Sequence, residues 1–400
     1  MNNDQNRTNL ARRHWLKTAT VAASALGTSL ACPWSFALET QHQTDGRFIL
    51  VFLRGGLDGL FAFAPNADPQ LASLRPNLAT ETLQHGIALG NSGFSAHPSC
   101  AIFAQLFASK ELAFAPCAGT TDKSRSHFQA QDLFELGNGQ MHGNSGLLAR
   151  AANATKGQSR IISFTNNLPL VLQGADRTPE VAPLSGGGLR MHQDKALTAI
   201  RAMHDQQASG AAIEQAMSTQ ADIDQAMGMD AKASRGAART NGFPKAAETM
   251  ARMLRANPKL AMAFIDIGGF DTHASEENTL SRSLPFLGQG LLALRDGLGE
   301  AEWKRTQVLM CTEFGRTARE NGTQGTDHGH GSLALLAGGA INGGRQIGDF
   351  AGLSNSALNE GRDLPVHVDW RRLIGRSLYE TQGFNQATLQ KILPGMPNFA

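Results

Sequence analysis

Hydrophobic residues along this chain gather in short continuous runs, separated by polar and glycine-rich segments. The clearest runs lie at 47–53, 112–115, 260–267 and 306–312. A continuous apolar run is typical of a strand that is buried on both faces, as in a parallel sheet. Two shorter strand candidates and a last apolar segment lie at 161–164, 170–172 and 332–337.

Predicted helices lie between these runs, at 101–109, 126–136, 246–256 and 284–298. Strands that alternate with helices predict an α/β fold, with a mostly parallel central sheet and helices on both faces. The stretch 195–242 differs in composition, because it is rich in alanine, glutamine, methionine and aspartate and has no large aromatic residue. We expect this stretch to form a helical cap with flexible connections.

The N-terminus has the features of an export signal. Arg12 and Arg13 are followed by an aromatic residue, a leucine and a lysine. A mild apolar stretch of about 14 residues follows at 18–31, which is too short to span a bilayer as a helix. A small-residue cleavage site at 35–37 completes the pattern, and the paired arginines resemble the twin-arginine signal.

We therefore expect a signal peptide at 1–37 and a mature domain at 38–400, located in the periplasm or secreted. The twin-arginine translocase would be a partner during export. Two alternatives stay open for this segment. It could be an amphipathic N-terminal helix of the fold, or a lipoprotein signal in which Cys32 is lipidated.

Composition narrows the function classes. The formal net charge is +2, so the chain lacks the basic field that favours nucleic acid as a partner. No segment after the signal has 18 continuous apolar residues, so we expect no membrane span in the mature chain. A hydrophobic content of 41% is ordinary for a globular protein and is compatible with one large α/β domain.

Three of the expected strands are followed by an acidic residue beside glycine or threonine, namely Asp58, Asp271 and Glu313. In an open parallel sheet, ligands bind at the carboxyl ends of the strands. We therefore expect the three carboxylates at one edge of the sheet. Crowded carboxylates raise one another's pKa, so a cation between them would stabilise the arrangement.

Histidines add nitrogen donors to this acidic set. Mixed oxygen and nitrogen ligands suit one or two divalent ions, of which zinc and manganese are the best candidates. Two such ions would clamp the attacking and leaving oxygens of a phosphoryl-type substrate. The predicted metal ligands are Asp58, Asp271, His273, Glu313, Asp327, His328 and His330.

Each of these residues also has an ordinary structural explanation. Asp58 could be a turn residue, because aspartate beside glycine favours turns. Asp271 could cap a following helix, and Glu313 could form an ion pair with Arg316. The joint pattern is stronger than any single member, because all of the residues fall at the same predicted edge.

Five motifs together resemble a large bacterial family of twin-arginine-exported proteins that is labelled only as a domain of unknown function. That family is similar to the alkaline phosphatase and sulfatase superfamily, which implies a fold of that type and a metal-dependent site. The motifs are Arg-Gly-Gly-Leu-Asp-Gly-Leu (54–60), Ser-His-Phe (126–128), Gly-Gly-Phe-Asp-Thr-His (268–273), Glu-Phe-Gly-Arg-Thr (313–317) and Gly-Thr-Asp-His-Gly-His-Gly (325–331).

The resemblance also implies roles for single residues. Phe314 stands where the superfamily has a histidine, unless the pair at 327–328 replaces it from the next loop. The metal-ligand positions of the superfamily match Asp58, Asp271, His273, Glu313 and either His328 or His330.

The nucleophile of that superfamily is a serine, threonine or cysteine, and Ser126 lies in the stretch that resembles the nucleophile region. Ser126 is also a good N-cap for a helix beginning at His127, whose N-terminus would favour an anion such as phosphate or sulfate. Arg54, Arg125 and Arg316 are the candidates to stabilise charge that develops on the substrate.

Two functions of different classes follow from the sequence. The first is an exported metal-dependent hydrolase or transferase that acts on a phosphate or sulfate ester, and therefore on an anionic substrate. The second is a non-catalytic exported protein of the same fold, which binds a partner protein or a surface polymer.

Overall fold

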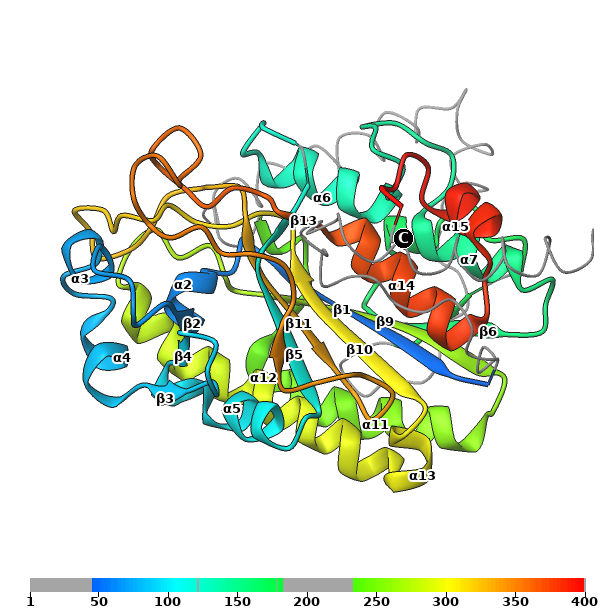
Figure 1. Ribbon diagram of the computed structural model, residues 1–400. Coiled ribbons are helices and arrows are strands. Elements are labelled where there is room, and N and C mark those ends of the chain that lie inside the picture. Colours follow the sequence, from blue (N-terminus) through cyan, green and yellow to red (C-terminus); the bar gives the residue numbers. More distant parts are fainter. Residues whose placement is uncertain (1–44, 121, 178, 183–232, 399–400) are drawn as a thin grey trace, which may run out of the picture. The chain divides into compact units, whose positions relative to one another are not determined.

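A ten-stranded sheet lies at the centre of the part of the chain that the structure describes (Figure 1). The structure is a computed structural model, and it describes residues 45–120, 122–177, 179–182 and 233–398. The strands are, in their order across the sheet, β12 (Arg345–Gln346), β5 (Leu112–Gly119), β11 (Ser332–Ala337), β10 (Thr306–Thr312), β1 (Arg47–Arg54), β9 (Leu260–Gly268), β6 (Arg160–Phe164) and β7 (Glu180–Val181), with β13 (Val368–Asp369) beside β5 and β8 (Ala238–Arg239) beside β9.

Most neighbours in this sheet are parallel, as the sequence predicts. Only β11 runs antiparallel to its two neighbours, β10 and β5. The described helices are α2 (Gly59–Ala62), α3 (Leu71–Leu74), α4 (Thr80–His85), α5 (Ala101–Ala108), α6 (His127–Leu136), α7 (Leu147–Ala154), α11 (Phe243–Ala256), α12 (Glu276–Leu298), α13 (Glu300–Trp303), α14 (Trp370–Gln382) and α15 (Gln386–Ile392).

Short elements complete the described chain. A separate small sheet has the strand order β2 (Phe63–Ala64), β4 (Ser95–Ala96) and β3 (Ile87–Ala88). Three single turns of 3-10 helix are η1 (Pro98–Cys100), η2 (Leu170–Leu172) and η3 (Thr240–Gly242).

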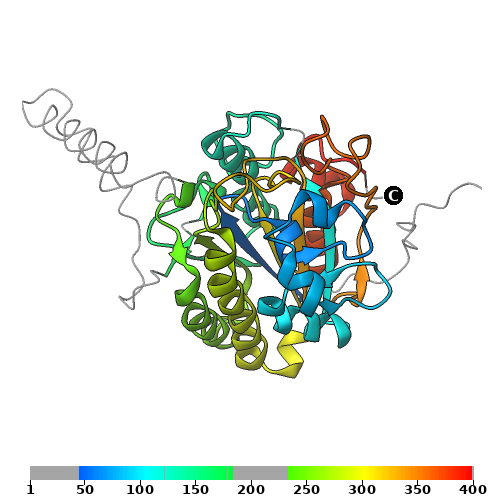
Figure 2. The same cartoon turned by 90° about the vertical axis from the view of Figure 1, so that its left-hand side faces the viewer.

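Helices cover both faces of the central sheet, which explains why the strand sequences are continuously apolar. All eight residues of β1 are buried. On one face, Val51 belongs to the core cluster that includes residues of α11 and α12, and Figure 2 shows these two helices side by side. On the other face, the ring of Phe52 stacks on Phe134 of α6 at 4.1 Å, and Phe134 contacts Trp370 of α14 at 4.4 Å.

The order of the central strands fixes where the motifs lie. β1 lies between β10 and β9 and is parallel to both. Leu53 is paired with Thr312 of β10 and with Ile267 of β9, so the three strands end at the same level. The loops that follow them therefore start together at one edge of the sheet.

Two sequence-based expectations need comment. The strand expected at 170–172 is wrong, because these residues form the 3-10 turn η2 after Pro169, with Leu172 N–H donating to the Pro169 carbonyl. The expected signal peptide at 1–37, and the expected cap up to residue 232, lie outside the described residues. The last part of that stretch, 233–242, contributes β8 and η3.

Among the described residues, no helix combines the length and apolar character that crossing a membrane requires.

Candidate metal centre

Several loops and the N-terminus of one helix lie together at the carboxyl ends of the central strands. Asp271 and His273 lie just after β9, His328 lies on the long loop between β10 and β11, and His127 is the first residue of α6. A bridge between Arg316 and His328 holds the two parts of that long loop against each other.

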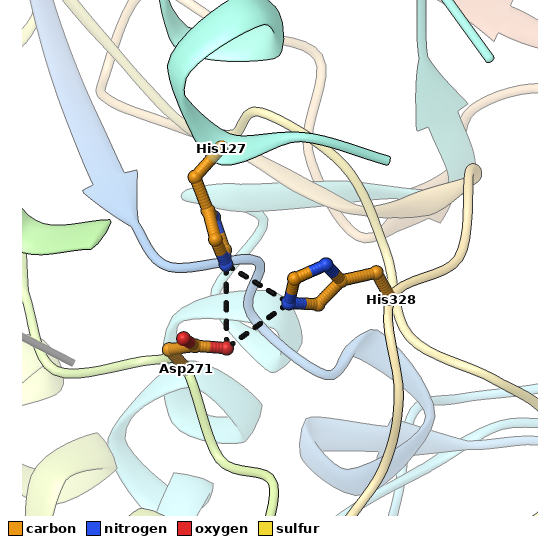
Figure 3. A group of neighbouring side chains, drawn as sticks. All are labelled: His127, Asp271 and His328. Carbon is orange, nitrogen blue, oxygen red and sulfur yellow. Dashed lines mark hydrogen bonds and ion pairs between the residues drawn. The ribbon is translucent and has the colours of Figure 1, made fainter. Parts of the chain in front are cut away.

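Three of these side chains point their ligand atoms at one another (Figure 3). The Nε2 atoms of His127 and His328 are 3.0 Å apart, and each lies 3.3 Å from Oδ1 of Asp271. In a tetrahedral zinc site with ligand distances of about 2.0–2.1 Å, neighbouring ligand atoms are about 3.3 Å apart. The three atoms thus have the spacing of one face of such a site.

His273 adds a fourth candidate ligand atom, a nitrogen, at the open side of this group. Its Nε2 lies 3.0 Å from Nε2 of His328 and 3.0 Å from Oδ1 of Asp271. The side chain of His273 is 31% exposed, whereas that of Asp271 is 2% exposed. A bound ion would therefore have buried ligands on one side and access to solvent beside His273.

Hydrogen bonds at the far side of each ring decide which nitrogen is free. Nδ1 of His328 lies 2.8 Å from the carbonyl oxygen of Arg125, which can only accept, so the proton of a neutral His328 is on Nδ1. Nδ1 of His127 lies 2.7 Å from Oε1 of Glu313 and donates to that carboxylate. When both rings are neutral, each Nε2 atom carries a lone pair. The two lone pairs repel each other unless a proton or a metal ion lies between them.

The charges around the site favour a cation. Burial opposes ionisation of Asp271, but its close contacts with His127, His273 and His328 and the charge of Arg316 hold its pKa well below the ordinary value. Burial also disfavours protonated His127, but hydrogen bonds to Asp271 and Glu313 outweigh it and raise the pKa of His127 to about 9. Without a metal, a proton fills part of this role.

Glu313 does not reach the group of ligand atoms but supports it from behind. Its buried carboxylate accepts hydrogen bonds from the backbone N–H of Gly55 at 2.8 Å and from Gln131 Nε2 at 2.9 Å, in addition to His127. Thr312 Oγ1 donates to the other oxygen at 2.8 Å. Burial raises the pKa of Glu313, and the contact with His127 outweighs this effect and lowers it. The residue therefore fixes the ring of His127, and it does not pair with Arg316.

Asp58 is engaged elsewhere at the same edge. Its Oδ1 accepts from the N–H groups of Leu60 and Phe61 at the start of α2, and its Oδ2 lies 2.5 Å from Nη1 of Arg75. The carboxyl group of buried Glu276 also faces Asp58, and burial together with the Asp58 charge raises the pKa of Glu276. Asp58 thus has the contacts of a helix cap and of an ion pair.

The remaining two predicted ligands flank the group. Oδ1 of Asp327 lies 3.5 Å from Nδ1 of His273, on the solvent side. Nδ1 of His330 lies 2.9 Å from Oδ1 of Asp363 and 3.0 Å from the side-chain nitrogen of Asn359. His330 therefore lies with its own carboxylate partner. Of the seven predicted ligands, Asp271 and His328 belong to the close group with His127, and His273 lies beside it.

Two of the arginines that the sequence offered as charge stabilisers, Arg54 and Arg316, use all of their guanidinium nitrogens in hydrogen bonds within the protein. Arg316 is buried and donates to Asp271 Oδ1 at 2.7 Å and to backbone carbonyl groups around it. Arg54 is also buried, and its three nitrogens donate at 2.7–2.9 Å to Asp266, Gln131 and Glu135. Both arginines organise the acidic edge from inside the protein.

Ser126 occupies the N-cap position of α6, but its side chain makes no capping hydrogen bond. Its hydroxyl is half-buried and is adjacent in sequence to the ligand candidate His127. Sequence reasoning singled out the Ser-His-Phe motif for the serine alone and missed the histidine. One signal in the sequence could have identified His127. A histidine that directly follows a helix cap lies at a helix N-terminus, and this helix was expected at the functional edge.

The chain was compared with known sequence families. The family described as "Protein of unknown function (DUF1501)" matches residues 115–393, which is more than half of the chain. The chain belongs to this family. No curated protein sequence matches the chain.

Solved structures that resemble this member of the DUF1501 family include three bacterial proteins at TM-scores below 0.5. A protein in the alkaline phosphatase superfamily from Vibrio parahaemolyticus has a TM-score of 0.39 at 10% identity, covering 77% of this chain and 64% of that one. The C-terminal periplasmic domain of EcEptC from Escherichia coli, in complex with zinc, has 0.39 at 8% identity, covering 75% and 74%. The alkaline phosphatase from the Antarctic bacterium TAB5 has 0.38 at 10% identity, covering 86% and 100%.

The chain therefore spans just under two thirds of the length of the first of these proteins. With likenesses of this size, the chemistry of the site has to be argued from its own geometry.

Replacing Glu313 should weaken metal binding without removing a ligand. Glutamine keeps an oxygen facing Nδ1 of His127 but loses the charge, so we expect about tenfold weaker binding for Glu313→Gln. Alanine removes the contact, so Glu313→Ala should weaken it up to about a hundredfold, within the range known for such outer partners. Titration with cobalt(II), followed by its absorption spectrum, measures both.

The matched control is Glu300→Gln, because Glu300 is an exposed glutamate paired with Lys304 on the surface. It should bind cobalt(II) like the wild type. Wild-type affinity in Glu313→Ala would show that Glu313 has no part in orienting His127 for a metal.

Proposed function

We propose that this chain is an exported hydrolase or transferase that binds a divalent metal at His127, Asp271 and His328 and acts on a phosphate or sulfate ester. The observation that carries the proposal is the pair of Nε2 atoms, 3.0 Å apart and both facing the Asp271 carboxylate. Two nitrogen acceptors and an anion gathered in this way repel one another unless a proton or a metal ion lies between them, and a divalent metal ion can contact all three at once.

One zinc ion suits the group best. Imidazole nitrogens suit zinc, whereas manganese favours carboxylate, carbonyl and water oxygens. Asp58 and Glu313, which a second ion would need, are already engaged by Arg75 and by His127 with Gln131. A bound zinc ion would act as a Lewis acid on an ester oxygen.

The N-terminus of α6 supports an anionic substrate. The first N–H groups of a helix are unpaired and carry partial positive charge, which favours phosphate or sulfate. Here that helix begins at His127, so the same turn supplies both a ligand candidate and an anion-binding edge. The five motifs, which resemble those of the phosphatase and sulfatase superfamily, agree with this substrate class.

Ser126 is the nucleophile in this proposal. Its Oγ would form a bond to phosphorus or sulfur while the bond to the ester oxygen breaks, and that oxygen leaves with the electron pair and takes a proton from water. The proton of the serine hydroxyl passes to solvent. Water then attacks the serine ester and releases phosphate or sulfate, or a second alcohol attacks in a transferase.

Arg316 has a positioning role in the same scheme, because it holds Asp271 at 2.7 Å. Arg54 anchors α6 through Gln131 and Glu135 and so fixes the helix that begins at His127.

Metal removal tests the centre. A ligand that binds only the folded state raises the melting temperature, so a chelator should lower it in the wild type. The chelator-induced shift should be absent in His328→Ala, which should also hold less than about a tenth of an equivalent of metal. The control His85→Ala removes an exposed histidine of α4 and should behave like the wild type.

The chelator-induced shift should also depend on pH. In the metal-free protein the pKa of His127 is about 9, above its usual value near 6.5. A metal must displace this proton, so its apparent affinity, and the chelator-induced shift with it, should rise from about pH 6.5 to about pH 9. Wild-type melts that superimpose with and without chelator at every pH would remove the proposal.

Ser126→Ala tests the nucleophile. We expect kcat for aryl phosphate or aryl sulfate esters to fall by roughly 10³-fold or more, with the metal content unchanged. Ser73→Ala is the matched control, because Ser73 is exposed on α3 and its hydroxyl donates to the carbonyl oxygen of Gln70. Full activity of Ser126→Ala would exclude this nucleophile. A metal-loaded wild type that turns over no ester would favour the non-catalytic binding protein instead.

Export is part of the proposal, and it rests on the paired arginines of the signal sequence. The double variant Arg12→Lys and Arg13→Lys should leave the precursor in the cytoplasm, because the translocase reads the arginine pair. Cell fractionation and immunoblotting measure this. A normal periplasmic yield of the variant would contradict the twin-arginine route.

A further inference from the structure

A cavity of about 250 Å³ adjoins the metal centre on the side of the loop 317–321. Two of its lining residues touch the centre directly. Asp327 Oδ1 lies 3.5 Å from Nδ1 of His273, and Arg362 Nη1 donates to the carbonyl oxygen of His328 at 2.8 Å. A substrate whose ester reaches the metal ligands would therefore extend naturally into this cavity.

The acidic groups of the lining are turned to other donors. Both carboxylate oxygens of Glu320 accept hydrogen bonds from the backbone or side chain of Asn77, and one also accepts from Leu78 N–H at 2.8 Å. Oδ1 of Asp327 faces Asn321 Nδ2 at 3.3 Å as well as His273. Both oxygens of Glu320 therefore have partners, and Oδ1 of Asp327 is directed at Asn321 and His273.

The basic groups of the lining keep free donors. Within the part of the chain that the structure describes, the Arg319 guanidinium has no hydrogen bond or ion pair. Arg362 uses Nη1 for His328 and for Asp363, and its other two nitrogens have no partner there. Free guanidinium donors favour a ligand that accepts hydrogen bonds, and oxyanions match the planar guanidinium best.

We propose that this cavity binds a second anionic group of the substrate, a sulfate, phosphate or carboxylate carried beside the ester that reaches the metal centre. That the bound anion is part of a substrate rests on the proposed function. It narrows the substrate class to polyanionic esters, which carry a second anionic group beside the reacting ester. Arg319 then sets specificity and takes no part in the chemical step.

Binding of inorganic sulfate, measured by calorimetry on the full-length mature protein at low ionic strength, tests the proposal. Arg319→Gln should weaken sulfate binding about tenfold, as expected for the loss of a hydrogen bond to a charged group. The matched control is Arg282→Gln, which removes an exposed arginine of α12 and should bind like the wild type. Inorganic phosphate and acetate, titrated in parallel, identify the anion that the cavity prefers.

Two further samples separate this inference from the metal centre. Sulfate binding in the cavity should persist in chelator-treated wild type and in His328→Ala, and it should still be weakened by Arg319→Gln. Binding that disappears with the metal and is unaffected by Arg319→Gln would overturn the cavity proposal while supporting the metal centre. Arg319-dependent sulfate binding in an untreated wild type that takes up no divalent metal when zinc is supplied would support the cavity and count against the proposed function.

Discussion

Asp58, Asp271 and Glu313 follow three adjacent parallel strands, and each is at most 2% exposed. Burying an ionised carboxylate costs several kcal/mol unless it is paired and hydrogen-bonded. The structure meets this constraint with a separate set of donors for each group. Arg75 pairs with Asp58, Arg316 with Asp271, and His127 with Glu313. The loops at this edge are held by those pairs, so the neutralisation of buried negative charge organises the whole functional edge.

The pairing is complete for Asp58 and Glu313 but not around Asp271. There, the imidazoles present nitrogens whose protons are held on the opposite side of the ring by Glu313 and by the Arg125 carbonyl. A cation binds where the protein leaves acceptors together without a donor. In the neighbouring cavity the charges are reversed. There Arg319 presents donors without an acceptor, which favours an anion.

The candidate centre is also tied to the hydrophobic core. His127 begins α6, and Phe134 on the same helix stacks against Phe52 of β1 and contacts Trp370 of α14. Gln131, one turn beyond His127, joins α6 to Glu313 at the end of β10. The position of the His127 ring therefore depends on packing between the helix layer and the sheet, which makes the site rigid enough to hold a metal ligand in place.

Much of the fold could be predicted from the sequence alone. The runs at 47–53, 260–267 and 306–312 are continuously apolar because their strands are covered by helices on both faces, and they became β1, β9 and β10. A local pattern suffices there, since burial of a strand on two faces dictates residue type position by position. The sharing of one edge by Asp58, Asp271 and Glu313 followed from the same argument, because parallel strands end together.

Only the tertiary structure decided which of those residues belong to the centre. Asp58 forms an ion pair with Arg75, and Glu313 contacts the far side of the His127 ring. His127 is the first residue of α6, a helix start that the sequence analysis had singled out only for Ser126. These choices depend on differences of about an ångström between atoms of segments far apart in the chain. Residue type and spacing determine that a carboxylate or an imidazole reaches the edge, but only the packed geometry determines whether it meets a guanidinium, a carbonyl group or another lone pair there.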